Sequence, residues 1–97
     1  GIINVGGNKV HPEGIERIIN DFPGVSICTV YSKKSSVMGG LVAVDILPSR
    51  RISDFPAFKK ELRSFCATHL ESFKVPVIIR LVNSIDTNST GKLKRDL

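Results

Sequence analysis

Apolar residues recur at helical spacing in two stretches of the chain. The first stretch begins at Pro12, which suits the first turn of a helix, and Pro23-Gly24 ends it. In the second, Ser53 or Asp54 can cap a helix that is expected to run to about Phe73. The regularly spaced apolar residues are Ile15, Ile18, Ile19 and Phe22 in the first stretch, and Phe58, Leu62, Phe65, Cys66, Leu70 and Phe73 in the second. The pattern predicts two amphipathic helices, each with one buried face.

Three further stretches are short, apolar and typical of strands. In the stretch 25–31, Val25, Ile27, Thr29 and Tyr31 share one face, and Cys28 and Val30 share the other. The stretch 41–47 is apolar on both faces apart from Asp45, which predicts a central strand. We expect these two strands to pair as a hairpin through a polar loop at 32–40. The third strand is expected at 77–82, with Arg80 pointing away from its apolar neighbours.

The first ten residues predict a short strand or hairpin with Gly6-Gly7 at its turn. Adjacent glycines permit positive φ angles or the close approach of another backbone. Together the elements predict an α+β fold for one domain, residues 1–97. We expect a small sheet of about three main strands with two helices packed on it. A short N-terminal strand and turn and a C-terminal loop that carries Lys92 complete the expected fold.

The C-terminal loop ends in the pair Gly91-Lys92. The preceding residues, 83–90, are polar apart from Ile85 and show neither a helical nor a strand period, which indicates a loop. A lysine that follows a glycine in such a loop is a mobile cation with three donors, suited to a phosphate or a carboxylate. On local composition alone, a frayed basic C-terminus that only keeps the domain soluble is the favoured interpretation.

The chain is basic, with 14 Lys and Arg against 9 Asp and Glu and a net charge of +5. This balance attracts anions, so one alternative is a stand-alone basic module for nucleic acid or an acidic protein. All five Phe lie on or beside the helical stripes, which leaves Tyr31 as the only strand aromatic for base stacking. RNA binding therefore rests on charge alone, and we expect no nucleic-acid partner.

Common catalytic and metal-binding motifs are absent from the sequence. A phosphate-binding P-loop needs a glycine where Asp86 stands and Ser or Thr where Leu93 stands. Cys28 and Cys66 form no CxxC pair or Cys/His cluster, so we expect reduced, buried thiols and no metal site. The longest apolar run is far too short to span a membrane.

Two stretches resemble a known family. Residues 6–16 read GGNKVHPEGIE, similar to "GG-x-K-V-x-P-x-E-V-E". Residues 73–76 read FKVP and residues 87–95 read TNSTGKLKR, similar to "Y-K-V-P … T-x-T-G-K-I-x-R". Both motifs are typical of the C-terminal domain of the adenylate-forming (ANL) superfamily, which includes acyl-CoA synthetases. Gly14 and Asp86 depart from the family pattern, where Glu and Pro are usual.

The resemblance implies a mobile lid for an ATP-dependent carboxylate–thiol ligase. It implies that Lys92, with Gly91 giving the loop its freedom, bridges the substrate carboxylate and the α-phosphate while the acyl-adenylate forms. It also implies that Gly6, Gly7 and Lys9 face the site in a second orientation and help shape the tunnel for the acceptor thiol.

The resemblance also sets the expected cofactors and partners. ATP with Mg²⁺ and CoA would be bound mainly by an N-terminal domain that the chain lacks, and a carboxylic acid would be the substrate. The thiol acceptor is CoA or a phosphopantetheine carrier protein. Because the chain begins at Gly1, we expect it to be a piece of a longer enzyme, inactive alone. The acyl-CoA synthetase likeness implies a cytoplasmic enzyme of fatty acid metabolism.

Overall fold

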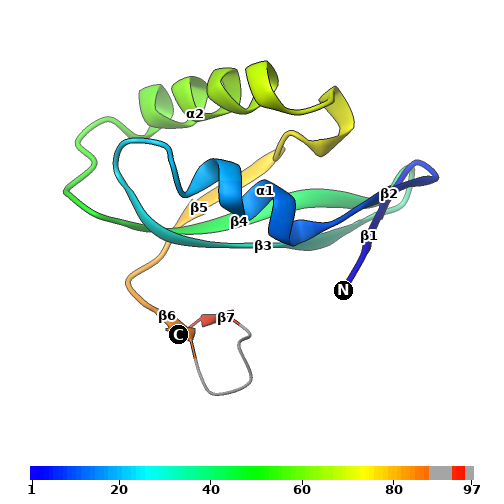
Figure 1. Cartoon of the computed structure of the whole chain (residues 1–97), viewed down its shortest axis with the longest axis horizontal. Helices are drawn as coiled ribbons and strands as arrows, with labels where there is room; N and C mark the ends of the chain where they lie inside the picture. Colours follow the sequence, from blue (N-terminus) through cyan, green and yellow to red (C-terminus); the bar gives the residue numbers. More distant parts are fainter. Residues whose placement is uncertain (88–92, 96–97) are drawn as a thin grey trace.

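The computed structural model describes residues 1–87 and 93–95. Each of the two helices follows a pair of strands along the chain. Figure 1 shows helices α1 and α2 on one side of the main sheet, with β6 and β7 on the other. The elements are β1 (Ile3–Val5), β2 (Asn8–Val10), α1 (Pro12–Ile19), β3 (Val25–Ser35), β4 (Gly39–Pro48), α2 (Phe55–His69), the 3-10 turn η1 (Ser72–Lys74), β5 (Ile78–Leu81), β6 (Ile85–Thr87) and β7 (Leu93–Arg95).

The main sheet has the strand order β3-β4-β5, so β4 is central as predicted. Strand β4 pairs antiparallel with β3 and parallel with β5. Helix α2 lies on the connection between β4 and β5, because a parallel pair needs a long crossover. Two shorter antiparallel pairs, β1 with β2 and β6 with β7, complete the described structure. The α+β prediction of a small sheet with two helices packed on it is confirmed.

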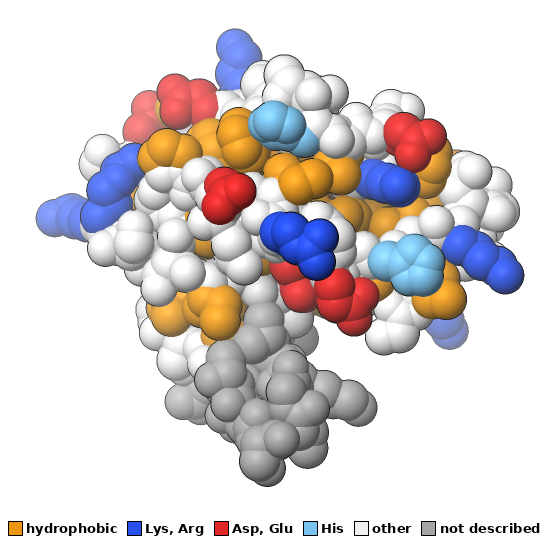
Figure 2. Space-filling model, viewed as in Figure 1, with side chains coloured by type: hydrophobic (Ala, Val, Ile, Leu, Met, Phe, Trp, Pro, Cys, Tyr) orange, Lys and Arg blue, Asp and Glu red, His pale blue; other side chains and the backbone are white. Residues whose placement is uncertain are grey.

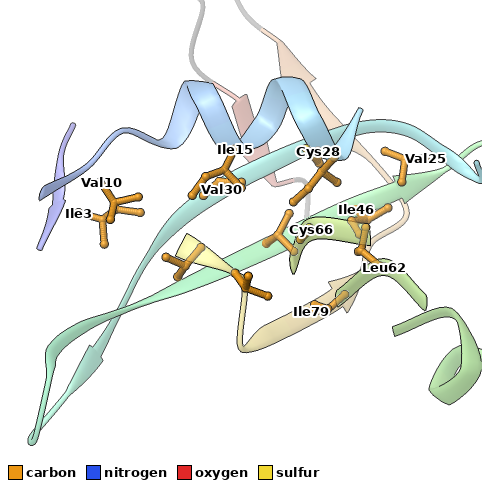
Figure 3. Packing of buried hydrophobic residues seen from close by; sticks show 14 of the residues in the cluster. Ile3, Val10, Ile15, Val25, Cys28, Val30, Ile46, Leu62, Cys66 and Ile79 are labelled. Atoms are coloured by element: carbon orange, nitrogen blue, oxygen red, sulfur yellow. The ribbon is translucent and has the colours of Figure 1, made fainter. Parts of the chain in front are cut away.

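The core lies between the helices and one face of the sheet. Figure 3 shows buried side chains from the N-terminal hairpin, both helices and all three main strands pointing toward one another. Phe22 closes one end of this core, with its ring 5.6 Å from that of Phe58 and 5.2 Å from that of Phe65. The cluster consists of Ile3, Val5, Val10, Ile15, Ile19, Val25, Cys28, Val30, Val42, Val44, Ile46, Phe58, Leu62, Cys66, Val75 and Ile79. Burial of these apolar side chains is the main source of stability.

Both helices end earlier than the apolar pattern predicted. Helix α1 ends at Ile19, and Phe22 packs on the core from the following turn. Helix α2 begins as predicted, because the Oδ1 of Asp54 accepts a hydrogen bond of 3.1 Å from the backbone N–H of Ala57. It ends at His69, since Leu70 has extended φ and ψ angles of −130° and 150°. Leu70 and Phe73 still pack against the core, so the apolar pattern continues beyond the helix itself.

The predicted loop at 32–40 is mostly strand. Strand β3 continues to Ser35 and β4 begins at Gly39, so only 36–38 form the turn. Near the end of this long hairpin, the polar side chains of residues 32–34 are exposed while the backbone stays paired. A register shift between Val25 and Ile27 also places Val25 in the core with Cys28 and Val30, against the predicted alternation.

The C-terminal region also contains more strand than expected. Residues 85–87 were predicted as part of a polar loop, but they form β6 and pair with β7. A three-residue strand is too short to show a clear alternating pattern in sequence. The predicted third strand shortens to Ile78–Leu81, although the backbone N–H of Val77 still donates to the carbonyl of Val42.

Candidate functional site

The predicted turn at Gly6-Gly7 is confirmed. Strands β1 and β2 pair with Val5 opposite Asn8, so these two glycines alone form the connection. Their φ angles are +56° and +90°, as a two-residue hairpin turn of this kind requires. The side chain of Asn4 supports the turn, because its Oδ1 accepts a hydrogen bond of 3.0 Å from the backbone N–H of Gly7.

The turn rests on the tip of the β3–β4 hairpin. The backbone N–H of Gly6 donates a hydrogen bond of 2.9 Å to the carbonyl of Met38. A Cβ atom at Gly40 would lie 2.8 Å from the carbonyl oxygen of Asn4, so the two hairpins approach too closely for any side chain there. The sequence predicted this freedom for Gly6-Gly7 but gave no sign that Gly40 shares the same contact.

The outer side of the glycine turn is open. A Cβ atom at Gly7 would meet nothing within 4 Å, and Lys9 is exposed next to it on β2. Apolar side chains are also exposed at this end of the molecule, with Ile2 57%, Met38 40% and Val37 88% accessible. Open backbone, the ammonium of Lys9 and apolar side chains together suit a ligand or protein surface with both anionic and apolar parts.

The second predicted site falls outside the described residues. Gly91 and Lys92 lie there, so their placement remains a prediction. The strands on either side are described, and Thr87 pairs with Leu93 in the β6–β7 ladder. Strands β6 and β7 both contact β3, on the side of the sheet away from the helices (Figure 1). The glycine turn and the β6–β7 pair therefore belong to different parts of the fold.

Glu16, the last residue of the first family motif, ties helix α1 to the sheet. Its Oε2 accepts a hydrogen bond of 2.8 Å from the backbone N–H of Val30 on the outer edge of β3. Partial burial raises the pKa of the Glu16 carboxyl, and the bond from Val30 partly offsets this by favouring the ionised form. The first family motif therefore contains a residue with a structural role, Glu16, in addition to the glycines of the turn.

A buried carboxylate joins all three main strands. Asp45 on β4 is fully buried, and its Oδ1 accepts hydrogen bonds from the Tyr31 hydroxyl at 2.9 Å and from the Arg80 Nε at 3.1 Å. The hydrogen bond to Asp45 raises the pKa of the Arg80 guanidinium. The sequence pattern identified Asp45 and Arg80 as polar exceptions in apolar strands, but it did not predict that they contact each other. That contact follows from the parallel register of β4 and β5, which places Asp45 opposite Arg80.

The cysteines fit the prediction of buried thiols. Both are free and buried, and burial raises the pKa of the Cys28 thiol to about 12 and that of Cys66 to about 11. Neither thiol ionises near neutral pH, so neither serves as a ready nucleophile. Within residues 1–87 and 93–95, no three His, Cys, Asp or Glu side chains are grouped to hold a metal ion. No helix in the same residues has the length and apolar character to cross a membrane.

Comparisons with known proteins agree on one family. The model of the AMP-binding enzyme C-terminal domain matches residues 14–92. A 3,4-dihydroxybenzoate–[aryl-carrier protein] ligase of Bacillus anthracis is 38% identical over 96 residues, 99% of this chain and 22% of the relative. A 2-succinylbenzoate–CoA ligase of Listeria monocytogenes is 27% identical over 98% of this chain and 19% of the relative.

Comparison with solved structures shows a shared fold. The crystal structure of a Brucella canis acyl-CoA synthetase superposes with a TM-score of 0.88 at 18% identity, over 97% of this chain and 17% of that one. The chain thus spans about a fifth of the length of the curated relatives it matches. The family match covers most of the chain. The chain belongs to the family of AMP-binding enzyme C-terminal domains.

Proposed function

We propose that this chain is the mobile C-terminal lid of an ATP-dependent carboxylate–thiol ligase. The observation that carries the proposal is the match of the AMP-binding enzyme C-terminal domain to residues 14–92. The relatives are ligases, and each is several times longer than the matched region. The lid therefore works with its own N-terminal domain, which holds most of the nucleotide and acyl site.

In the first half-reaction, Lys92 supplies the cation. Formation of an acyl-adenylate spreads negative charge over phosphoryl oxygens, and a fixed cation stabilises that charge in the transition state. Gly91 lets the backbone approach the reacting groups. Removing one such donor costs enzymes roughly 10²–10³-fold in rate, which sets the size of the expected effect.

In the second half-reaction, the Gly6-Gly7 turn faces the acceptor thiol. The open side of Gly7 would leave room for a narrow pantetheine arm, and Lys9 is exposed, so its ammonium could meet an anionic group of the acceptor. The bond from Gly6 to Met38 holds the turn on the β3–β4 tip, so the backbone is ordered before the acceptor arrives. The turn thus shapes the thiol tunnel without taking part in proton transfer.

ATP with Mg²⁺ and CoA complete the proposed reaction. ATP supplies the adenylyl group, and the thiol of CoA or of a carrier protein takes the acyl group. Mg²⁺ binds largely through the phosphates of its nucleotide, so we assign the metal ion, with ATP, to the N-terminal domain. Two relatives are named as ligases of the aromatic acids 3,4-dihydroxybenzoate and 2-succinylbenzoate. Aromatic acids are therefore the first substrates to test, followed by fatty acids. We assign the full-length enzyme to the cytoplasm.

The alternative of a stand-alone basic module has less support. Figure 2 shows acidic and basic side chains interspersed on the face it draws, without one continuous basic surface. The hydroxyl of Tyr31 donates a hydrogen bond to the Asp45 carboxylate. This contact does not favour Tyr31 as a platform on which a base could stack. Membership of a ligase domain family gives the chain a role that net charge alone does not.

The decisive experiment measures both half-reactions in the full-length enzyme. Lys92→Ala should lower acyl-adenylate formation by about 10²–10³-fold while largely sparing thioester formation from a supplied acyl-adenylate. Lys33→Ala, which removes an exposed lysine on β3, is the matched control and should change neither step. If Lys92→Ala slowed both half-reactions equally, the result would contradict the role of Lys92 in acyl-adenylate formation.

A second variant tests the glycine turn and should affect mainly the thioester-forming step, whereas Lys92→Ala should affect mainly adenylation. Gly7→Ala places a side chain at a positive φ on the open side of the turn, so thioester formation should fall more than adenylation. A fall confined to adenylation would contradict the role given to the turn.

The purified chain alone should show no ligase turnover with either aromatic or fatty acids, because it lacks the rest of the site.

A further inference from the structure

A groove of about 830 Å³ lies between helix α2 and strand β5, away from the glycine turn and the β6–β7 pair. Its five α2 residues lie at positions 59, 60, 63, 64 and 67, so they share one face of the helix. The opposite wall is the edge of β5 and the residues that lead into it. The lining residues are Lys59, Lys60, Arg63, Ser64, Ala67, Leu70, Ser72, Val75, Val77, Ile78 and Ile79.

The groove follows the edge of β5 rather than one of its faces. Successive side chains of a strand point to opposite faces, yet the consecutive residues Val77, Ile78 and Ile79 all line the groove. The N–H of Val77 donates to β4, so the backbone groups of Ile78 and Arg80, at the alternate positions, turn away from β4. Among the described strands, β5 pairs only with β4.

The two edges of the main sheet differ. At the β3 edge, the carboxylate of Glu16 already accepts the backbone N–H of Val30. At the β5 edge, the neighbouring wall is a helix face rather than a strand, and Val77 is 47% exposed. An unpaired sheet edge offers a template for another strand, and proteins usually cover it or place charges on it. No described strand covers the β5 edge, so this edge is available to an incoming segment.

The wall beside this edge is strongly cationic. Lys59, Lys60 and Arg63 line the groove, and no Asp or Glu lies among the lining residues. Within residues 1–87, the salt bridges are Lys74 with Glu71 and Arg80 with Asp45, so these three cations take part in neither. The ammonium of Lys59 lies 4.9 Å from the centre of the Phe55 ring. The groove thus combines positive charge, apolar floor and free backbone.

We propose that this groove binds an extended acidic segment of a partner protein, which adds to β5 as a further strand. Backbone hydrogen bonds to Ile78 and Arg80 would supply affinity, as in other cases of strand addition. Every second side chain of the segment would face α2, where carboxylates would meet Lys60 and Arg63. The alternate side chains would lie beside Ile78 and favour apolar residues. This inference goes beyond the ligase proposal and does not depend on it.

The test uses a short fluorescein-labelled peptide that alternates Glu with Val. Fluorescence anisotropy with the chain should detect binding at low salt that weakens as salt is added. The double variant Lys60→Glu with Arg63→Glu should weaken binding by about tenfold or more, because two attractions become repulsions. The matched control, Lys33→Glu with Lys34→Glu, makes the same charge change on β3 at the other edge of the sheet and should stay within about twofold of the parent.

A second probe separates strand addition from simple charge attraction. The same peptide with N-methyl groups at alternate backbone positions keeps its charges but cannot form the ladder, so its binding should fall by about tenfold or more. In NMR spectra, the parent peptide should shift the amide signals of Ile78 and Arg80. Equal weakening by both charge variants, unchanged binding of the N-methyl peptide, or no binding at low salt would each overturn the proposal.

Discussion

The backbone N–H of Gly6 donates a hydrogen bond of 2.9 Å to the carbonyl of Met38, across two hairpins that are far apart in sequence. The bond fixes the open glycine turn of β1–β2 on the tip of β3–β4. Because Gly6 has a φ angle of +56°, the contact depends on a conformation that other residues adopt only with strain. The proposed acceptor surface is therefore built by backbone geometry more than by side chains.

Replacing Gly6 should destabilise the chain through this geometry. Gly6→Ala forces an L side chain into the left-handed region, at a cost of about 1–2 kcal/mol. Its Cβ would also lie 3.0 Å from the Met38 Cε, although that flexible side chain can shift. Urea unfolding followed by circular dichroism measures the loss.

Gly14 provides the matched control for Gly6. It lies in helix α1, and a Cβ there would meet nothing within 4 Å. Gly14→Ala should therefore stabilise the chain by about 0.5–1 kcal/mol, because alanine loses less entropy on entering a helix. A Gly6→Ala variant as stable as the parent, or a destabilised Gly14→Ala, would contradict this account of the two glycines.

Stability should respond to pH through Glu16. Burial raises the pKa of this carboxyl in the folded chain above its ordinary value of 4.5, so the folded state holds the proton more tightly than the unfolded state. Its contribution to stability is therefore greatest below pH 4.5 and falls as the pH rises through the folded pKa. Glu16→Gln keeps an acceptor for the Val30 N–H and removes the charge, so it should remove this decline.

The measurement is the free energy of unfolding at a series of pH values between about 4 and 7, for the parent and two variants. The stability of Glu16→Gln relative to the parent should increase with pH. Glu16→Ala should lose about 1–3 kcal/mol throughout, because the Val30 N–H loses its acceptor. Glu61→Gln, on the exposed face of α2, is the control. A parent and Glu16→Gln with identical pH dependence would show that Glu16 does not cause the decline.

Local pattern was sufficient to predict the type and order of the main elements. Helical spacing located α1 and α2, and the apolar stretch around Asp45 identified the central strand. The glycine pair identified the N-terminal turn. Each of these predictions depends on residues that are neighbours in sequence. The ends of elements were predicted less well, because Leu70 and Phe73 remain apolar after α2 has ended.

Contacts between distant residues were not predictable in this way. The bond from Gly6 to Met38, the anchor from Glu16 to Val30 and the α2–β5 groove all require the tertiary arrangement. The family motifs pointed to Gly6 and Glu16 without indicating what each contacts. The roles of Gly91 and Lys92 rest on the motif alone, since they lie outside the described residues.

The pairing of Tyr31 with Asp45 gives the last prediction. Asp45 is fully buried, and the Tyr31 hydroxyl donates to it at 2.9 Å while Arg80 contacts both carboxylate oxygens. A hydrogen bond to a charged group contributes about 1.5–3 kcal/mol. Tyr31→Phe should therefore lower the free energy of unfolding by this amount with little change in packing.

Thr29 offers a matched control on the same strand, because its buried Oγ1 has no hydrogen-bond partner among the described residues. Thr29→Val keeps the shape and removes an unsatisfied hydroxyl, so it should be neutral or stabilising. A double-mutant cycle with Asp45→Asn completes the test. The cost of Tyr31→Phe should fall to about half when it is combined with Asp45→Asn, since a neutral acceptor forms a weaker hydrogen bond. Strictly additive effects would mean that Tyr31 stabilises the sheet by packing alone and that the Asp45 carboxylate is held by Arg80 without it.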